Sequence, residues 1–223
     1  MNNKFVRVAL GIFATAIFAA SSSASLLVNG GFEDTPIVGA EEPGAGTGWT
    51  SYGAAFRVQQ TIVDGVICDP VSCAGAYDGT VALKIFGDSG AYQDFAAVEG
   101  DSFSGGAFAI NPLNADQLVG TQIAATALVF LDASGAFISD VVSNLLDSNS
   151  TPDEWIELAV SGVAPAGTAT VRFQVFTTGG GGGAPRFDGA YFDAAAPVPV
   201  PAAIWLMGSA MIGMIGLRRK NAA

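Results

Sequence analysis

Hydrophobic and polar residues alternate with a period of two through much of the middle of the chain. In residues 170–176, for example, Val171, Phe173 and Val175 occupy every second position. Successive side chains on a β-strand point to opposite faces, so this period predicts strands with a buried face. The predicted strands cover residues 26–28, 57–63, 81–86, 91–95, 103–110, 122–131, 137–138, 155–160, 170–176 and 186–192.

Turn signals rich in glycine and aspartate, such as those at 88–90 and 132–135, separate these strands. We expect at most one turn of helix, at 111–120 or 141–146. The five glycines at 179–183 predict a flexible hairpin loop. Many short strands joined by such turns predict an all-β fold, a single antiparallel β-sandwich.

The N-terminal segment has the organisation of a secretory signal peptide. Lys4 and Arg7 precede an apolar stretch at 8–20, and small residues lead to a cleavage site before Ser25. The sequence therefore predicts a signal peptide at 1–24, with an uncleaved membrane anchor as the alternative. Residues 25–196 follow without a linker, which predicts one domain.

The C-terminal segment pairs an apolar stretch with a basic end. Residues 202–217 are apolar, and Arg218, Arg219 and Lys220 follow. As a helix the stretch is about 24 Å long, slightly shorter than the roughly 30 Å hydrocarbon core of a bilayer. The basic cluster predicts a transmembrane helix with a cytoplasmic C-terminus. A buried core helix is the alternative.

Residues 197–223 closely resemble the PEP-CTERM sorting signal of Gram-negative bacteria. The motif is Val198, Pro199, Val200 and Pro201, with Val200 at the position where the name-giving motif has glutamate. The resemblance implies a partner, an exosortase-type transpeptidase that removes the tail. It also implies that the protein is held in the inner membrane before processing. The destination would then be the cell surface or the exopolysaccharide and biofilm matrix.

Charge and composition exclude several functions for residues 25–196. This region holds all 20 acidic residues but only Arg57, Lys84, Arg172 and Arg186 as bases, a net charge of −16, and the chain contains no histidine. Such a negative field repels nucleic acid. A serine nucleophile lacks its histidine base. The acidic pairs Glu41–Glu42 and Asp153–Glu154 are adjacent in sequence, which does not suit a pair of carboxylates across a cleft. We therefore expect no enzymatic activity.

Cys68 and Cys73 are the two cysteines of the chain. An exported protein meets an oxidising compartment, so we expect a disulfide that closes a small loop. A metal site is disfavoured because neither a further thiol nor an imidazole is present to complete it.

Landmarks along the whole body resemble carbohydrate-binding modules of the galactose-binding-like jelly-roll group. They are the strings NGGFE (29–33), GW (48–49), GAYQDF (90–95), EGDSFSGGA (99–107), WIEL (155–158), VRFQV (171–175) and FD (187–188). The resemblance implies a jelly-roll sandwich. It also implies a structural calcium ion held by Glu33 and Asp188 between the two ends of the domain. Solvated or turn-capping roles for both carboxylates are the alternative.

Flat aromatic rings and amide groups are the side chains that hold sugars. The candidates are Trp49, Tyr52, Tyr92 and Gln93, together with Tyr77, Trp155 and Gln174; packing in the core or at its rim is the alternative for the tryptophans. We therefore expect an exported structural or adhesive matrix protein. A dedicated carbohydrate-binding module is the alternative, and a hydrolase is the least supported.

Overall fold

The computed structural model describes residues 25–34, 36–37, 41–59, 61–63, 66–68 and 76–194. These residues are all-β, with no helix among them. The strands are β1 (Glu41–Pro43), β2 (Thr50–Gln59), β3 (Thr61–Val63), β4 (Val66–Cys68), β5 (Val81–Ala96), β6 (Ser102–Ile110), β7 (Val119–Gly120), β8 (Ile123–Leu131), β9 (Phe137–Val142), β10 (Trp155–Val163), β11 (Thr170–Thr178), β12 (Gly181–Gly182) and β13 (Arg186–Ala194).

Three of the predictions fall outside this part of the chain: the signal peptide at 1–24, the apolar stretch at 202–217 and the sorting motif. Within the described ranges, no helix has the length and apolar character needed to cross a membrane. Cys68 ends β4 of the short β3–β4 hairpin, while Cys73 lies outside the described residues. The disulfide therefore stays a prediction.

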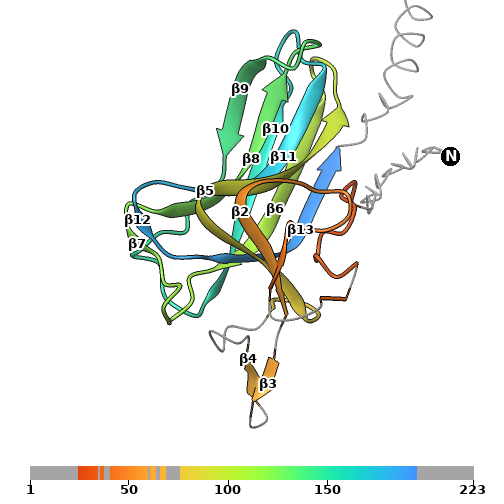
Figure 1. Cartoon of the computed structure of the whole chain (residues 1–223). Helices are drawn as coiled ribbons and strands as arrows, with labels where there is room; N and C mark the ends of the chain where they lie inside the picture. Colours follow the sequence, from red (N-terminus) through yellow and green to blue (C-terminus); the bar gives the residue numbers. More distant parts are fainter. Residues whose placement is uncertain are drawn as a thin grey trace, which may run out of the picture.

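Nine strands form one antiparallel sheet that folds over on itself, with the path β10-β6-β13-β5-β11-β8-β9; β2 pairs with β5, and β1 pairs with β2 (Figure 1). Layer I consists of β10, β6 and β13, together with the first half of the long strand β5 and the second half of β2. Layer II consists of the remaining halves of β5 and β2 with β11, β8 and β9. The two layers face each other across the core, and Thr126 of β8 donates a hydrogen bond to the Leu158 carbonyl of β10. This is the predicted β-sandwich.

Strand β5 is continuous, although the sequence predicts a turn at 88–90. Its first half pairs with β13 and its second half with β11. The neighbouring strand β2 has a register shift between Tyr52 and Ala54. Glycines with positive φ, Gly53 and Gly87, mark the bend of both strands. The predicted turn is wrong because pairing on both sides keeps the segment extended, and the glycines supply only a bend between layers.

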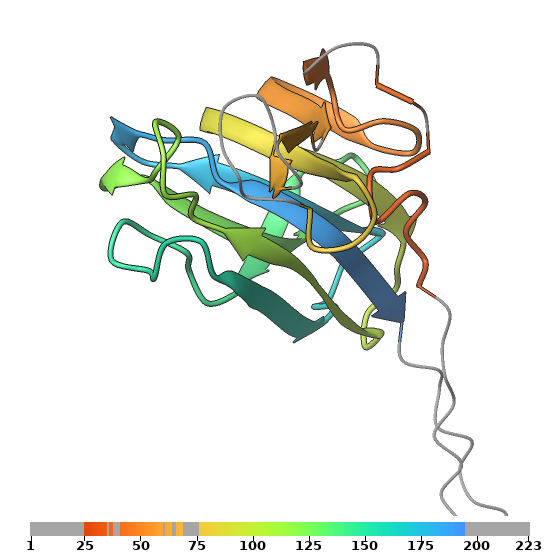
Figure 2. The same ribbon diagram turned by 90° about the horizontal axis from the view of Figure 1, so that it is seen from below.

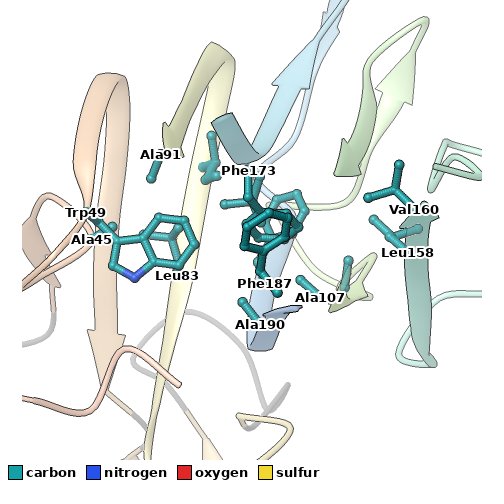
Figure 3. Packing of buried hydrophobic residues seen from close by; sticks show 14 of the residues in the cluster. Ala45, Trp49, Leu83, Ala91, Ala107, Leu158, Val160, Phe173, Phe187 and Ala190 are labelled. Atoms are coloured by element: carbon teal, nitrogen blue, oxygen red, sulfur yellow. The ribbon is translucent and has the colours of Figure 1, made fainter. Parts of the chain in front are cut away.

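The core is filled from the inward faces of both layers. Phe173 of β11 and Phe187 and Phe192 of β13 are fully buried, and Leu158 and Val160 of β10 close one side (Figure 3). Burial of each large side chain contributes about 1.5–3 kcal/mol to folding. The strands predicted at 122–131 and 170–176 are confirmed as β8 and β11. In β11 every second residue is buried, whereas in β8 the residues 124–128 are buried on both faces.

The segment 29–33 hooks onto the end of β13. Asn29 adopts a left-handed conformation with φ of 56°, and the Gly30 carbonyl accepts the amide of Ala190 at 2.9 Å. A Cβ on Gly30 would lie 2.1 Å from the Ala190 carbonyl oxygen, so only glycine fits there. Phe32 is fully buried. The string NGGFE is therefore a packing motif that joins the two ends of the domain.

The glycine run is not a flexible hairpin loop. It connects β11 of layer II to β13 of layer I, and Gly181–Gly182 pair with Val119–Gly120. A Cβ on Gly181 would lie 2.0 Å from the Val119 carbonyl oxygen. The run is glycine because it is packed against another backbone. Neither 111–120 nor 141–146 contains the expected helical turn, because both lie as loop or strand along the sheet edges.

Candidate functional site

The outer face of layer II carries a cluster of polar aromatic and charged side chains on adjacent strands. On β11, Arg172 and Gln174 alternate with buried residues and so point away from the core. Tyr92 of β5 lies directly opposite Gln174, and Asp94 lies opposite Arg172. Tyr52 of β2 comes next to this row. We call these five residues the tyrosine cluster.

Tyr52 lies across a glycine of the neighbouring strand. Its register partner is Gly90, where a Cβ would lie 2.6 Å from the Tyr52 hydroxyl oxygen. The missing side chain lets the ring lie over the sheet. Tyr52 is 39% exposed, and its ring centroid is 6.5 Å from that of Tyr92. Burial raises the pKa of Tyr52, so its hydroxyl remains a hydrogen-bond donor and acceptor at neutral pH.

Arg172 is fixed from two sides. Its Nε and Nη2 atoms donate to the two oxygens of Asp94 at 2.7 and 2.9 Å. The guanidinium carbon also lies 3.5 Å from the Tyr92 ring centroid, a cation–π arrangement. Hydrogen bonding to Asp94 raises the pKa of Arg172. Of the four basic residues between 25 and 196, the other three are buried, so Arg172 is the cation that this surface presents.

Two of the predicted sugar contacts serve the core instead. Trp49 is 9% exposed, packs on Phe32, and donates its indole N–H to the Asn29 carbonyl at 3.0 Å. Gln93 is 6% exposed, and its amide group donates to and accepts from the backbone of Val28. The structure brings Tyr52 and Tyr92 together on one surface and places Trp49 and Gln93 beneath it.

Arg172 and Asp94 are members of the cluster that the sequence did not single out. They are 78 residues apart, and only the register between β5 and β11 makes them opposite. Simple alternation predicts that Arg172 and Gln174 share a face of their strand. It does not predict which strand lies beside them and supplies Tyr92 and Asp94.

The candidate cation site lies between the ends of the domain, as expected for Glu33 and Asp188. Glu33 Oε1 accepts the amides of Thr80 and Val81, both at 2.6 Å. Asp188 is fully buried, and its two oxygens accept the amides of Asp78 at 2.9 Å and Gly189 at 2.6 Å. The two carboxylates therefore tie the segment 78–81 at the start of β5 to the segment 29–33 and to β13.

Asp188 is the most perturbed carboxyl of the described residues. Burial raises its pKa to about 7, and the negative charge of Glu33 adds to this. A Cβ on Gly31 would lie 3.8 Å from Glu33 Cγ and 3.9 Å from Asp188 Oδ1, so both carboxylates border the same backbone. Two uncompensated carboxylates suit a hard cation with oxygen ligands. The described residues hold no group of three or more metal-binding side chains, so backbone carbonyls or water must supply the remaining ligands.

The adjacent acidic pairs are engaged elsewhere. Glu41 pairs with Lys84 at 2.9 Å, and Glu42 pairs with Arg57 at 2.6 Å. Asp153 Oδ1 accepts the amide of Leu113 at 2.8 Å. These contacts are structural ion pairs and a turn cap.

Comparison with known proteins gave similarity in structure only: no protein-family model and no curated protein matches the sequence. A cyclase from Fischerella sp. TAU, in complex with 4-(1H-indol-3-yl)butan-2-one, matches with a TM-score of 0.55 and 11% identity. The match covers 79% of this chain and 100% of the cyclase.

A xylan-binding domain of carbohydrate-binding module family 22 matches with a TM-score of 0.50 and 17% identity, covering 79% of this chain and 99% of that domain. The arabinose-bound α-L-arabinofuranosidase MgGH51 matches with a TM-score of 0.50 and 14% identity. That match covers 78% of this chain but only 27% of the arabinofuranosidase. At these identities the likeness shows the fold, the jelly roll of carbohydrate-binding modules.

Proposed function

We propose that the chain is an exported, non-enzymatic protein that binds a neutral polysaccharide through the tyrosine cluster. The observation that carries this proposal is the arrangement of Tyr52 and Tyr92 beside the Arg172–Asp94 pair on an open sheet face. Aromatic rings pack against the apolar faces of sugars, and the polar groups beside them bind hydroxyls.

The charges around the cluster favour an uncharged glycan. Arg172 is neutralised by Asp94, and residues 25–196 carry a net charge of −16. A polyanion would meet repulsion without a free cation to offset it. An uncharged polysaccharide is not repelled by the negative charge of the protein.

The neighbours support the fold, and the surface chemistry supports the function. The same fold occurs in a xylan-binding domain and in a cyclase, so the fold does not choose between binding and catalysis. Carbohydrate binding agrees better with the exposed Tyr52 and the half-buried Tyr92 beside it than a purely structural role in a matrix does.

The first test is the replacement Tyr92→Ala. We expect it to weaken binding to a neutral polysaccharide by about tenfold, the order typical of a central aromatic contact. The measurement is retardation of the full chain in native gels cast with neutral arabinoxylan, β-1,4-galactan or mixed-linkage β-glucan. Tyr92→Phe, which keeps the ring, should retain binding.

Two further observations separate this proposal from its rivals. Binding to a neutral glycan should change little between low and high salt, because charges are not being paired. Retardation by none of the three neutral gels, or retardation only by alginate or polygalacturonate, contradicts the proposal. Val98→Ala, a change at an exposed residue in the turn after β5, serves as the folding control.

The delivery of the protein forms a second part of the proposal. The PEP-CTERM-like segment 197–223 and the N-terminal segment 1–24 support export and sorting by an exosortase-type enzyme. The inner-membrane stage would precede release to the cell surface or matrix, where an exopolysaccharide would be the glycan that the protein meets.

Intact-mass analysis of the protein from its native envelope tests this delivery. We expect a mass that lacks residues 1–24 and the tail beyond the motif at Val198–Pro201. A disulfide between Cys68 and Cys73 would lower the mass by the two thiol hydrogens. A chain that keeps residues 202–223 in the extracellular fraction contradicts the sorting proposal and leaves the binding proposal untouched.

We propose in addition that one calcium ion binds between Glu33 and Asp188. The residues fit, because the two carboxylates border the same backbone and, in the part of the chain that the structure describes, no ion pair is seen at either. An ion there would supply the positive charge that both lack and would fasten the N-terminal hook to β13.

A further inference from the structure

A second aromatic surface lies on the outer face of layer I, on the side of the sandwich opposite the tyrosine cluster. It consists of Tyr77, which precedes β5, Phe108 of β6, Trp155 and Glu157 of β10 and Tyr191 of β13. Phe108 is the register partner of Glu157, so both side chains lie on one face. We call these five residues the second aromatic surface.

Tyr77 forms a platform on this face. Its ring is stacked on Phe108 at a centroid distance of 3.7 Å and an interplanar angle of 8°, yet Tyr77 remains 47% exposed. Gly189 provides the space, since a Cβ there would lie 3.2 Å from Tyr77 Cδ1. Trp155 stands edge-on to Tyr77 at 5.9 Å and 63°. Phe108 covers one face of the Tyr77 ring, so the exposed part of the ring is its other face. The indole of Trp155 borders this ring at its side.

Tyr191 and Glu157 place polar groups beside this platform. Tyr191 is opposite Gly106, where a Cβ would lie 2.8 Å from its hydroxyl oxygen, so the ring lies across the strand. The hydroxyl donates to Glu157 Oε1 at 2.5 Å. Burial first and then this hydrogen bond raise the pKa of Tyr191 to about 12. Glu157 is exposed and therefore remains able to accept further hydrogen bonds.

The two outer faces repeat one arrangement. In each, a tyrosine lies across a glycine of the next strand: Tyr52 across Gly90 and Tyr191 across Gly106. In each, a second tyrosine and a carboxylate lie beside it. Covering a glycine is a structural role that accounts for Tyr52 and Tyr191. It does not account for Tyr77 and Trp155, which lie beside Tyr191 on the same face.

We propose that the second aromatic surface is an independent binding site for a neutral polysaccharide, which makes the protein a bivalent cross-linker of glycan chains. The ligand class rests on the proposed function, whereas the site itself does not. Tyr77 and Trp155 offer ring faces and Glu157 offers an acceptor, the groups that bind sugar hydroxyls and C–H faces. Asp193 of β13 lies on the same face, and these acidic side chains exclude a polyanion.

Cross-linking follows from the position of the two sites. The layers of a sandwich pack about 10 Å apart, and the two sites face in opposite directions. A straight glycan chain therefore reaches one site only, and two sites engage two chains. Avidity between chains then adds to each single affinity.

The test uses the full chain with soluble neutral arabinoxylan and β-1,4-galactan as probes. We expect the unchanged chain to bind and to precipitate the polysaccharide at a suitable ratio. Tyr77→Ala and Tyr92→Ala should each retain binding, weakened by about tenfold, and lose precipitation. The double variant should lose both. Val98→Ala, at an exposed residue that belongs to neither surface, should behave as the unchanged chain.

The fluorescence of Trp155 reports on the second site alone. Trp155 is half-buried on this surface, Trp49 is in the core, and Trp205, the third tryptophan, lies outside the described residues. The difference between the chain and its Trp155→Phe variant isolates the Trp155 signal. We expect this signal to change on addition of xylohexaose or β-1,4-galactotriose, and to change equally in Tyr92→Ala.

The outcomes separate the two proposals. If Tyr92→Ala abolishes all binding and the Trp155 signal never changes, the second site is refuted while the proposed function stands. If only Tyr77→Ala weakens binding, the tyrosine cluster is refuted as the site while the second surface stands. Binding to neither polysaccharide refutes both, as does binding that neither variant alters.

Discussion

The free energy of unfolding is expected to fall by as much as about 4 kcal/mol as the pH rises from about 4 to about 7 without divalent cations. The cause is Asp188, whose pKa is raised from 3.8 to about 7 in the folded protein. Between those two values the folded state binds a proton that the unfolded state has released. The contribution of Asp188 to stability is therefore fully present below pH 4, decreases through the window and is lost above pH 7.

The other shifted aspartates leave this window clear. Hydrogen bonds to neighbouring groups lower the pKa of Asp132 and Asp147 below 3.8. For Asp34, burial acts to raise the pKa, but hydrogen bonds with Thr47 and the charge of Arg57 outweigh it, and the pKa is lowered. Their contribution to stability is present above that pH and is lost only as the pH falls further. A slope between pH 4 and 7 thus reports on Asp188.

Urea unfolding at a series of pH values in chelator measures this slope. Asp188→Asn should flatten it, whatever its effect on absolute stability, whereas Asp140→Asn on the exposed edge strand β9 should not. A slope unchanged in Asp188→Asn contradicts the assignment.

Calcium should act through the same carboxylate. An ion at Glu33 and Asp188 keeps Asp188 ionised, so millimolar calcium should raise the melting temperature at pH 7 and abolish the fall. Chelation should reverse this, and Asp188→Ala should remove the response. Identical melting curves with calcium and with chelator would contradict the proposed calcium site, whereas the expected dependence of stability on pH would stand.

Asp116→Ala is expected to lower the free energy of unfolding by about 3–5 kcal/mol, the range for breaking a buried ion pair. Asp116 Oδ2 lies 2.8 Å from Lys84 Nζ and 3.4 Å from Arg186 Nη2, and both cations are almost wholly buried. The change leaves two positive charges in the interior with fewer partners. Glu41 remains within 2.9 Å of Lys84, which limits the loss.

The matched comparison is Asp94→Ala in the exposed pair with Arg172. Its side chain and that of Arg172 are 40% and 27% exposed, so solvent screens the pair and the loss should be about 1 kcal/mol or less. Denaturant unfolding of both variants decides the matter. Equal losses would mean that the Asp116 network contributes no more than a surface pair. Asp116→Asn, which keeps an acceptor, should fall between the two.

Much of the fold followed from side-chain alternation. Strands β8, β10 and β11 were predicted to within three residues at each end, because one face of each is consistently buried. Alternation does not predict a strand where both of its faces are buried, or where pairing with neighbouring strands keeps a segment with turn residues extended. The segment 88–90 has turn residues, yet β2 and β11 hold it extended from both sides.

The sequence predicted the types of residue in the candidate site, but it did not predict which individual residues lie there. Tyr52 and Tyr92 have the same character in sequence as Trp49, and only the packing of Trp49 against Phe32 separates them. Gln93 follows Tyr92 directly, and strand geometry sends it to the opposite face. Long-range register, which no local pattern contains, placed Arg172 beside Asp94.

The end of β13 has a mechanical consequence. β13 runs through the middle of layer I between β6 and β5, and Ser25 and Leu26 bind the backbone of Phe192 beside its last residues (Figure 2). Tension that enters at Ala194 while either face holds a glycan acts along this strand. Over residues 191–194 this strand is bonded to β6 on one side and to Ser25 and Leu26 on the other, so such a pull loads both sets of hydrogen bonds together.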